Sequence, residues 1–596
     1  MTYPPWLKIL TVFGCLLVGF NFHVPDFGGT YVSRNILAWL GMGIAIPALF
    51  WGPLWGTDGQ PGQMRWSRVW LAGLFIPVAG AFMLVAGNIL GAFDTLQGGH
   101  LLFPGMVLTF AVFTFGLAQN PLSAERSAGL LCLVLVAFLP QYLIHFVTTN
   151  PLVFFNVSLS LPSFLVQEFG GFAQYNLFGT FLVSLILLAI WAFTFVKLTR
   201  WQRLALVALL AIYALDFAMM RSKTALLSAG FGLGFMALHV RQVSNGGGAG
   251  ADIRRRFGQA LIVLSIAYAL VWAMTFYNPD RVIISPDWSP DSSSVRWRYS
   301  MWVIAWRSFL EAPLFGHGLG SFSATYLDHF ARYGLADGLS FLANTSLPHN
   351  LVMHVLTEMG LVGVVFLLAP LAFLAWFLLA RNPNIWLILA LTVPVVLHTQ
   401  FEYPYVASGW HYILLAFGWM VAMQGTRLPE RVLIVKNQRF GRASFVLLSL
   451  LCLALIYLCA SLLFEINRAT YKLQLDARQP IEVYIERRYS AAQRQHPILG
   501  RHMTAISDLM LLTRALDENR DNLVQQLALP RFEQNVLSYY SNKAIWDLAM
   551  RAYTQTQDVA AMQALITFIA PLQPKVAEAY QRDLEEAFAL SRRQAD

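Results

Sequence analysis

The chain has 596 residues and a formal net charge of +9; 57% of its residues are hydrophobic and only 12% are charged. Soluble domains usually contain about 25% charged residues, so this composition excludes an ordinary soluble protein. It also excludes a disordered or fibrous chain, because a sequence this hydrophobic does not stay solvated. Apolar runs long enough to cross a bilayer recur to about position 465, and they predict an all-α, polytopic membrane protein.

The apolar runs predict about 13 membrane-spanning helices. No small-residue cleavage pattern follows the first run, so we expect a retained helix there and not a cleaved signal peptide. The four cysteines fall inside apolar runs, where they are expected as small buried hydrophobes without a disulfide framework. The predicted spans are 6–20, 35–55, 69–90, 100–118, 128–147, 175–196, 204–220, 224–240, 259–276, 357–380, 384–400, 409–425 and 443–465.

Lys and Arg residues are concentrated in alternate connectors between the predicted spans. Such connectors are usually cytoplasmic. The intervening connectors 91–99 and 148–174 contain no Lys or Arg. We therefore expect a cytoplasmic N-terminus and an external C-terminus, which in a bacterium is periplasmic. The positively charged connectors contain Arg65, Arg68, Arg126, Lys197, Arg200, Arg203, Arg241, Arg254 to Arg256, Arg381, Arg427, Arg431, Lys436, Arg439 and Arg442.

Three segments interrupt the pattern of spans. Residues 244–251 (SNGGGAGA) indicate a flexible cytoplasmic linker, and residues 277–356 form a long external loop of the kind that is often functional. Residues 466–596 are polar and carry apolar residues at helical spacing, which predicts a small periplasmic helical domain. The predicted division is a transmembrane catalytic domain, 1–465, followed by the domain 466–596.

Positive charge on the external side opposes the insertion bias and therefore needs a reason. Arg221 and Lys223 either snorkel to lipid headgroups or form a cationic site for an anionic headgroup. The segment 295–311 has Arg298, Trp302 and further tryptophans at a spacing typical of a helix in the interface plane. The guanidinium group of Arg298 is also suited to bind a phosphate through two hydrogen bonds. A glycine-rich turn follows, at Pro313, Gly316, Gly318 and Gly320.

Several polar residues lie where the chain re-enters the membrane. His349 is either a hydrogen-bonded structural residue or a proton-transfer group, with Asn350 beside it and His354 as a weaker candidate. His398 and Glu402 are four residues apart, so they form either an internal brace or a functional pair. Two further polar residues, Gln174 and Asn176, lie at the start of a predicted span, shortly after a Gly-Gly pair.

The order of these motifs resembles the shared core of bacterial O-antigen ligases, O-antigen polymerases and protein O-oligosaccharyltransferases, over about residues 200–380. The resemblance rests on Arg298, Trp302, Pro313, the three glycines, His349-Asn350 and Glu358-x-Gly360-x-x-Gly363. Features outside this core resemble the pilin-glycosylating O-oligosaccharyltransferases: Gly170-Gly171-Phe172 with Gln174 and Asn176, His398-Thr399 with Glu402-Tyr403-Pro404, the terminal extension and, more weakly, Phe22-His23 with Pro25.

The chain departs from the family pattern at two positions. Lys223, in Ser222-Lys223-Thr224, stands where relatives commonly have arginine, and Arg221 comes just before it. Lysine keeps the charge but lacks the planar fork of arginine, so either residue is a candidate to contact phosphate. Leu347-Pro348 stands where protein-glycosylating relatives often have a second histidine.

The resemblance implies a GT-C-like membrane glycosyltransferase of the inner membrane with a periplasmic active site. It would transfer a preassembled glycan from undecaprenyl pyrophosphate to Ser/Thr hydroxyls of a pilin-like or other periplasmic protein, with inversion. In this reading Arg298, with Arg221 or Lys223, holds the pyrophosphate, and His349 acts as general base or as a donor to the pyrophosphate. The remaining candidates, Asn350, His398, Glu402, Gln174 and Asn176, would orient the acceptor or His349.

No metal ion is expected, because carboxylates near these residues are too sparse to chelate Mg²⁺. No other cofactor and no nucleic-acid partner are expected either. The expected partners are membrane lipid, the lipid-linked donor and the acceptor protein. Two alternatives stay open: an O-antigen ligase or polymerase acting on lipid A core or on a second lipid-linked glycan, and a lipid-glycan transporter. Repeat symmetry and broken helices near the midplane would favour the transporter.

Overall fold

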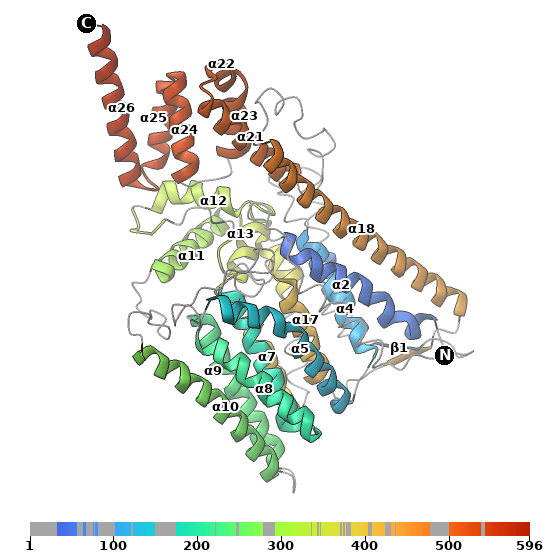
Figure 1. Cartoon of the computed structure of the whole chain (residues 1–596). Coiled ribbons are helices and arrows are strands. Elements are labelled where there is room, and N and C mark those ends of the chain that lie inside the picture. Colours follow the sequence, from blue (N-terminus) through green and yellow to red (C-terminus); the bar gives the residue numbers. More distant parts are fainter. Residues whose placement is uncertain are drawn as a thin grey trace. The chain divides into compact units, whose positions relative to one another are not determined.

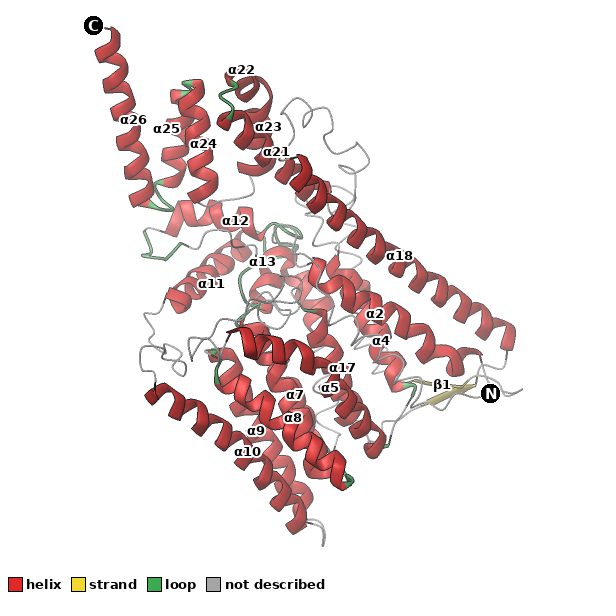
Figure 2. Ribbon diagram, viewed as in Figure 1, coloured by secondary structure: helices red, strands yellow, loops and turns green. Residues whose placement is uncertain are grey.

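The computed structural model describes the chain in segments. It leaves residues 1–31, 56–62, 67–75, 77, 81–101, 121–122, 150–174, 221, 246–249, 278–292, 335, 342–344, 346, 370–371, 373–375, 377–382, 403–407, 423–430, 435–436, 477–499, 538–542 and 596 outside the description. Helices dominate the described part, as Figure 2 shows, and the strands described there form one short two-stranded sheet. The chain is thus an all-α membrane protein.

The chain forms two compact units. Unit 1 comprises Met1–Gly80, Gly105–Trp288 and Phe366–Phe464, and unit 2 comprises Ala81–Pro104, Ser289–Val365 and Glu465–Asp596. Their elements are labelled in Figure 1. The elements of unit 1 are α2 (Val32–Phe50), the π-helical turn η1 (Trp51–Trp55), β1 (Gln63–Trp66), α4 (Leu102–Ala118, counted here from Gly105), α5 (Ala124–Thr149), α7 (Tyr175–Phe195), α8 (Arg200–Ala218), α9 (Lys223–Ser244), α10 (Gly250–Tyr277), α15 (Ile385–His398), α17 (Gly409–Ala422), β2 (Arg431–Ile434) and α18 (Gln438–Asp476, to Phe464).

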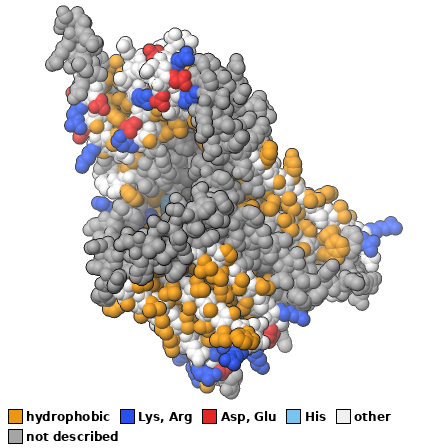
Figure 3. All heavy atoms as spheres, in the orientation of Figure 1, with side chains coloured by type: hydrophobic (Ala, Val, Ile, Leu, Met, Phe, Trp, Pro, Cys, Tyr) orange, Lys and Arg blue, Asp and Glu red, His pale blue; other side chains and the backbone are white. Residues whose placement is uncertain are grey.

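Hydropathy identifies several helices as candidate membrane spans. Six helices in the described part of the chain are long and apolar enough to cross a membrane: Tyr175–Phe195, Arg200–Ala218, Lys223–Ser244, Gly250–Met274, Leu351–Leu368 and Gln438–Leu462. Large hydrophobic side chains are exposed along α10, among them Ile262, Ile266 and Trp272. In Figure 3 hydrophobic side chains cover much of this part of the molecule, with Lys and Arg side chains at its lower edge. This surface is suited to contact lipid.

The Lys- and Arg-rich connectors are linked to one another at one end of unit 1. Antiparallel pairing joins β1 to β2, and Asn120 Nδ2 donates to the Leu49 carbonyl at 2.9 Å. Asn384 Nδ2 donates to the Ala422 carbonyl at 3.2 Å and Gln242 Nε2 to the Pro383 carbonyl at 2.9 Å. Arg256 donates to the Val196 carbonyl at 3.1 Å. The Lys- and Arg-rich connectors, which the sequence assigns to one side of the membrane, therefore lie at the same end of unit 1.

The predicted flexible linker at 244–251 is shorter than expected. Helix α9 continues to Ser244 and α10 begins at Gly250, nine residues before the apolar run at 259. The polar first turns of α10 are helical, and ion pairs of Asp252 with Arg255 and Arg256, at 2.6 and 2.5 Å, add support on the same helix face. The predicted runs 6–20 and most of 69–90 lie outside the described residues.

Unit 2 combines the long loop with the C-terminal helices. Its elements are α11 (Ser293–Glu311), α12 (Phe322–His329), η4 (Phe330–Gly334), α13 (Leu351–Gly363), the start of η5 (Val364–Leu368), α21 (Gly500–Asp517), α22 (Asp521–Leu523), η6 (Val524–Ala528), α23 (Leu529–Phe532), η7 (Glu533–Leu537), α24 (Lys543–Thr556), α25 (Val559–Ile569) and α26 (Pro574–Ala595). One hydrophobic core contains Met301, Ile304 and Tyr326 of the loop together with Trp546 of α24. Phe341 stacks on Trp546, with ring centroids 6.4 Å apart. The C-terminal helices therefore hold the loop helices in place.

Candidate active site

The glycine-rich turn after α11 packs backbone against backbone on α13. Gly316, Gly318 and Gly320 all have positive φ, and so does Gly360, which interrupts α13. A Cβ on Gly316 would lie 2.4 Å from the Glu358 carbonyl carbon, and one on Gly360 would lie 2.5 Å from the Leu314 carbonyl carbon. Only glycine satisfies both the conformation and the close approach. The tight turn predicted from the sequence is thus fixed directly to the helix that follows His349.

Hydrogen bonds of the Glu358 side chain connect this turn to α13. Its carboxylate accepts hydrogen bonds from the backbone N–H groups of Gly320 (2.9 Å) and Phe322 (3.1 Å). His354 Nε2 lies 2.8 Å from Glu358 Oε2, the oxygen that also accepts from Gly320, and both side chains are buried. The backbone donors at the end of the glycine turn are therefore occupied by a carboxylate of the protein itself, which assigns this part of the turn to structure and not to phosphate binding.

We expect Glu358→Ala to destabilise unit 2 by about 3–5 kcal/mol, because it leaves a buried histidine and two backbone donors without their shared carboxylate. The free energy of unfolding, or resistance of α11–α13 to proteolysis, measures this loss. Glu518→Ala is the matched control: Glu518 forms a partly exposed ion pair with Arg514 at 3.1 Å, and removing such a pair costs about 1 kcal/mol or less. Equal losses in the two variants would contradict the assigned role of Glu358.

Helix α11 brings Arg298 to the neighbourhood of His349. The indole N–H of Trp302 donates to the Pro348 carbonyl at 3.1 Å, and Thr357 Oγ1 donates to the Ala305 carbonyl at 3.1 Å. Arg298 lies one helical turn before Trp302, on the same face. His349 follows Pro348 directly, and both Arg298 and His349 are partly exposed. Trp302 thus has a positioning contact that the sequence did not indicate.

Another face of α11 is apolar. Tyr299, Trp306 and Leu310 are exposed, and Leu314 and Phe315 continue this surface into the turn. The backbone N–H of Val362 donates to the Leu314 carbonyl at 3.1 Å, and Leu361 beside it is also exposed. The exposed face of α11 is therefore continuous with that of α13, a helix apolar enough to span a membrane. This pattern agrees with the predicted helix at a membrane interface, with Trp306 at the surface.

The backbone at His349 is strained. Its φ is 51°, a left-handed conformation that is uncommon for residues other than glycine, although histidine, asparagine and aspartate adopt it more often than most. Asn350 then caps α13: its side-chain Oδ1 accepts a hydrogen bond from the Met353 N–H at 3.0 Å. Strained residues of this kind cluster at functional sites, so the conformation of His349 favours a functional reading. Asn350 has at least the structural role of a cap.

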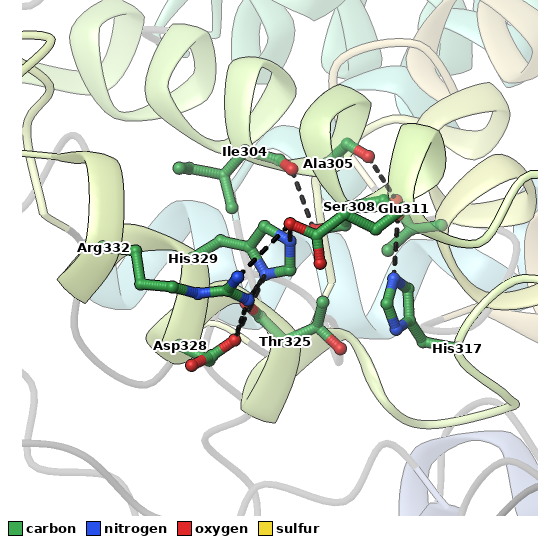
Figure 4. Close-up of polar contacts among 10 residues, drawn as sticks. Ile304, Ala305, Ser308, Glu311, His317, Thr325, Asp328, His329 and Arg332 are labelled. Atoms are coloured by element: carbon green, nitrogen blue, oxygen red, sulfur yellow. Dashed lines mark hydrogen bonds and ion pairs between the residues drawn. The ribbon is translucent and has the colours of Figure 1, made fainter.

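A second polar cluster, shown in Figure 4, braces the other end of α11. His317 Nε2 contacts the Ser308 carbonyl at 2.8 Å, and the buried His329 lies with Nε2 3.1 Å from Glu311 and Nδ1 2.9 Å from the Thr325 carbonyl. Arg332 pairs with both Glu311 and Asp328. Its hydrogen bond to Asp328 raises the pKa of the Arg332 guanidinium. The cluster connects α11 to α12 and η4.

In unit 1, candidate residues from two helix ends meet in a buried polar cluster. Asn176 Nδ2 donates to Glu402 Oε1 at 3.0 Å, and His398 Nδ1 lies 2.6 Å from Thr180 Oγ1. Thr180 Oγ1 also lies 3.1 Å from Nε2 of His411, whose other ring nitrogen contacts Ser408 at 2.7 Å. All six side chains are buried. The cluster lies at the end of unit 1 opposite the Lys- and Arg-rich connectors, because α7 and α17 begin here and α15 ends here.

Lys223 lies at this same end of unit 1. It begins α9 after Ser222, whose hydroxyl caps the helix by accepting from the Ala225 N–H at 3.1 Å. A Cβ on Gly179 would lie 2.8 Å from the Ala225 Cβ, so the first turn of α9 packs tightly on α7 beside Thr180. Two other predicted site residues, Arg221 and Gln174, lie outside the described residues.

Thr180, His411 and Ser408 were not predicted from the sequence, and Glu358 was recognised only as part of a motif. His411 carried a usable signal, since a histidine in an apolar run is unusual. Thr180 carried none, because threonine is common in membrane helices. Within the described residues, no group of three or more His, Cys, Asp or Glu side chains is arranged to hold a metal ion.

Comparison with known families gives one match. Residues 206–368 match the family model described as O-antigen ligase. The matched stretch contains Lys223, Arg298, His349 and Glu358, and it agrees with the core predicted at about 200–380. It supports the O-antigen ligase superfamily and a glycosyl transfer function of the ligase or polymerase type. No curated protein matches the sequence significantly.

Proposed function

We propose that this membrane protein is a protein O-oligosaccharyltransferase, which transfers a preassembled glycan from undecaprenyl pyrophosphate to Ser/Thr hydroxyls of periplasmic or pilin-type proteins. The observation that carries the proposal is the junction of α11 and α13. There the side chain of Trp302, one helical turn after Arg298, donates a hydrogen bond to Pro348, the residue directly before His349 with its positive φ. This junction lies inside the stretch that matches the O-antigen ligase family.

In the proposed reaction the acceptor oxygen attacks the anomeric carbon of the glycan and the bond from that carbon to the pyrophosphate oxygen breaks, which inverts the anomeric centre. His349 takes the hydroxyl proton as general base. The leaving pyrophosphate retains the bonding electrons, and Arg298, with Lys223 or Arg221, neutralises this developing charge. His398, Glu402, Asn176, Gln174 and Asn350 position the acceptor or His349. No step requires a metal ion or another cofactor.

The proposed membrane orientation follows from charge. The linked Lys- and Arg-rich connectors lie on the cytoplasmic side by the positive-inside rule, which puts the buried cluster of His398 and Glu402 toward the periplasm. We further propose about 13 spans in the inner membrane, a periplasmic location for the C-terminal helices, and a contribution of these helices to acceptor choice.

The acceptor is tested by expressing the chain in a host that supplies a lipid-linked glycan, a pilin-type protein and a ligase-deficient lipopolysaccharide core. We expect glycan on the pilin, detected by mass spectrometry of the intact protein. The description of the matching family favours one competitor, an O-antigen ligase, which would place glycan only on lipid A core. That outcome would replace the protein-acceptor proposal, and transfer to neither acceptor would contradict both.

A further inference from the structure

Four candidate membrane spans of unit 1 end or begin at two neighbouring connectors. Helix α7 ends at Phe195 before α8 begins at Arg200, and α9 ends at Ser244 before α10 begins at Gly250. The apolar runs of α8 and α10 begin only at 204 and 259, so the cations before them lie at the level of lipid headgroups. Five of these cations are called the basic corner: Lys197, Arg200, Arg203, Arg255 and Arg256.

The first turn of α8 is fixed by a capping box. The backbone N–H of Gln202 donates to Thr199 Oγ1 at 3.3 Å, and the backbone N–H of Thr199 donates to Gln202 Oε1 at 3.0 Å. Arg200 and Arg203 are three residues apart, so they lie on one face of this helix. Arg200 is exposed and Arg203 is half-buried. The capped turn therefore holds two guanidinium groups side by side.

The start of α10 is held between the two connectors. Arg256 Nη1 donates to the Val196 carbonyl, in the connector between α7 and α8, at 3.1 Å. Arg254 Nη1 donates to Ser244 Oγ, at the end of α9, also at 3.1 Å. A Cβ on Gly250 would lie 2.1 Å from the Ser244 carbonyl oxygen, so α10 begins directly against the end of α9. The cations of α10 are thus fixed beside those of the connector between α7 and α8.

Few carboxylates balance this positive charge. Asp252 is the one acidic residue in the sequence of the two connectors and the adjoining helix turns, and it pairs with Arg255 at 2.6 Å and Arg256 at 2.5 Å. Glu125, at the start of α5, interacts with the charge of Lys197. Five cations therefore face two carboxylates, and an anion that binds here relieves their mutual repulsion.

Exposed apolar side chains begin directly beside these cations. Trp201 is 77% exposed and Leu204 is 51% exposed. The two residues are three apart, so they form a stripe of α8 next to the stripe of Arg200 and Arg203. Tryptophan is typical of the membrane–water interface. A soluble phosphate compound would leave this apolar stripe in water, whereas a phospholipid would cover it with acyl chains.

We propose that the basic corner binds the headgroup phosphate of an anionic phospholipid, whose acyl chains pack on Trp201 and Leu204. The arginines donate paired hydrogen bonds to the phosphate oxygens. By the proposed orientation, this lipid belongs to the cytoplasmic leaflet, whose anionic lipids attract cations next to membrane spans. The bound lipid joins α8 to α10 and stabilises the folded state. This inference does not depend on glycan transfer.

Native mass spectrometry of the full-length protein, delipidated in detergent, measures the binding of phosphatidylglycerol and of neutral phosphatidylcholine. We expect the wild type to bind phosphatidylglycerol more tightly. Arg200→Gln with Arg203→Gln should weaken phosphatidylglycerol binding about 25-fold, because each cation near an anionic headgroup contributes about fivefold. Phosphatidylcholine binding should stay unchanged.

The matched control is Arg439→Gln with Arg442→Gln. These two arginines are also three residues apart and lie near the start of another candidate span, α18. They are outside the basic corner, so their replacement should change phosphatidylglycerol binding less than about threefold. Equal weakening by the two arginine pairs would overturn the proposal, because surface charge in general would then attract the lipid.

Two further measurements separate lipid binding from packing, since Arg203 is half-buried. Arg200→Gln alone, at an exposed position, should weaken phosphatidylglycerol binding about fivefold. In phosphatidylcholine nanodiscs the thermal unfolding midpoint of this variant should equal that of the wild type. Added phosphatidylglycerol should raise the midpoint of the wild type more than that of Arg200→Gln with Arg203→Gln.

Two outcomes with the wild type would also overturn the proposal. One is equal binding of phosphatidylglycerol and phosphatidylcholine, which would show that the site does not select an anion. The other is displacement of phosphatidylglycerol by glycerol phosphate, which would identify a soluble phosphate compound as the ligand. We expect glycerol phosphate to leave the bound lipid in place, because it lacks the acyl chains that cover Trp201 and Leu204.

Discussion

Arg298→Ala is expected to slow glycan transfer at limiting donor by about 100- to 1,000-fold, the usual loss when one preorganised charge-stabilising group is removed. The arginine lies one turn before Trp302, whose bond to the Pro348 carbonyl fixes this face of α11 beside His349. A guanidinium is suited to contact a pyrophosphate through two parallel hydrogen bonds. The rate at low and at saturating donor separates weaker donor binding from slower chemistry.

Two variants on the same helix sharpen this prediction. Arg296 is exposed and two residues from Arg298, so it points to a different face of α11. Arg296→Ala should therefore change the transfer rate little. Arg298→Lys keeps the charge but loses the planar fork, so its rate should fall between those of the wild type and Arg298→Ala. If Arg296→Ala and Arg298→Ala lost activity equally, a specific pyrophosphate contact by Arg298 would be wrong.

The membrane helices were largely predictable because their physical cause is local. A bilayer selects apolar runs of a certain length, and the predicted runs at 175–196, 204–220 and 384–400 correspond to α7, α8 and α15. Helix ends were less predictable. Helix α18 continues to Asp476, well past the apolar run that ends at 465, because helix formation does not stop where hydrophobicity does.

The grouping of unit 2 was not predictable from local patterns. Four predicted membrane spans separate the loop 277–356 from the C-terminal helices in the sequence, yet Tyr326 and Trp546 belong to one core. The pattern of an amphipathic helix predicts that its apolar face is buried, but it does not identify the helix that packs on this face. The short pairing of β1 with β2 was missed for the same reason, since strands of four residues inside polar connectors leave no periodic signal.

The identity of the candidate site residues was predictable from the sequence, but the residues that they contact were not. His349, Arg298 and Glu402 stand out because ionisable groups near a membrane need a reason. The partners that position them, Trp302 for the His349 turn and Asn176 for Glu402, were invisible as partners because each contact joins residues far apart in the chain. Glycines gave the clearest local signal, since Gly316 and Gly360 permit a backbone approach that no other residue allows.

The transfer rate of purified His349→Asn, measured over a single turnover with a lipid-linked glycan and an accepted substrate, shows whether His349 acts as the general base. Asparagine tolerates the positive φ of 51° at this position, so the variant should fold and remain in the membrane. It does not serve as a general base. We expect the rate to fall by about 100- to 10,000-fold with normal thermal stability. Transfer at the wild-type rate would contradict this role of His349.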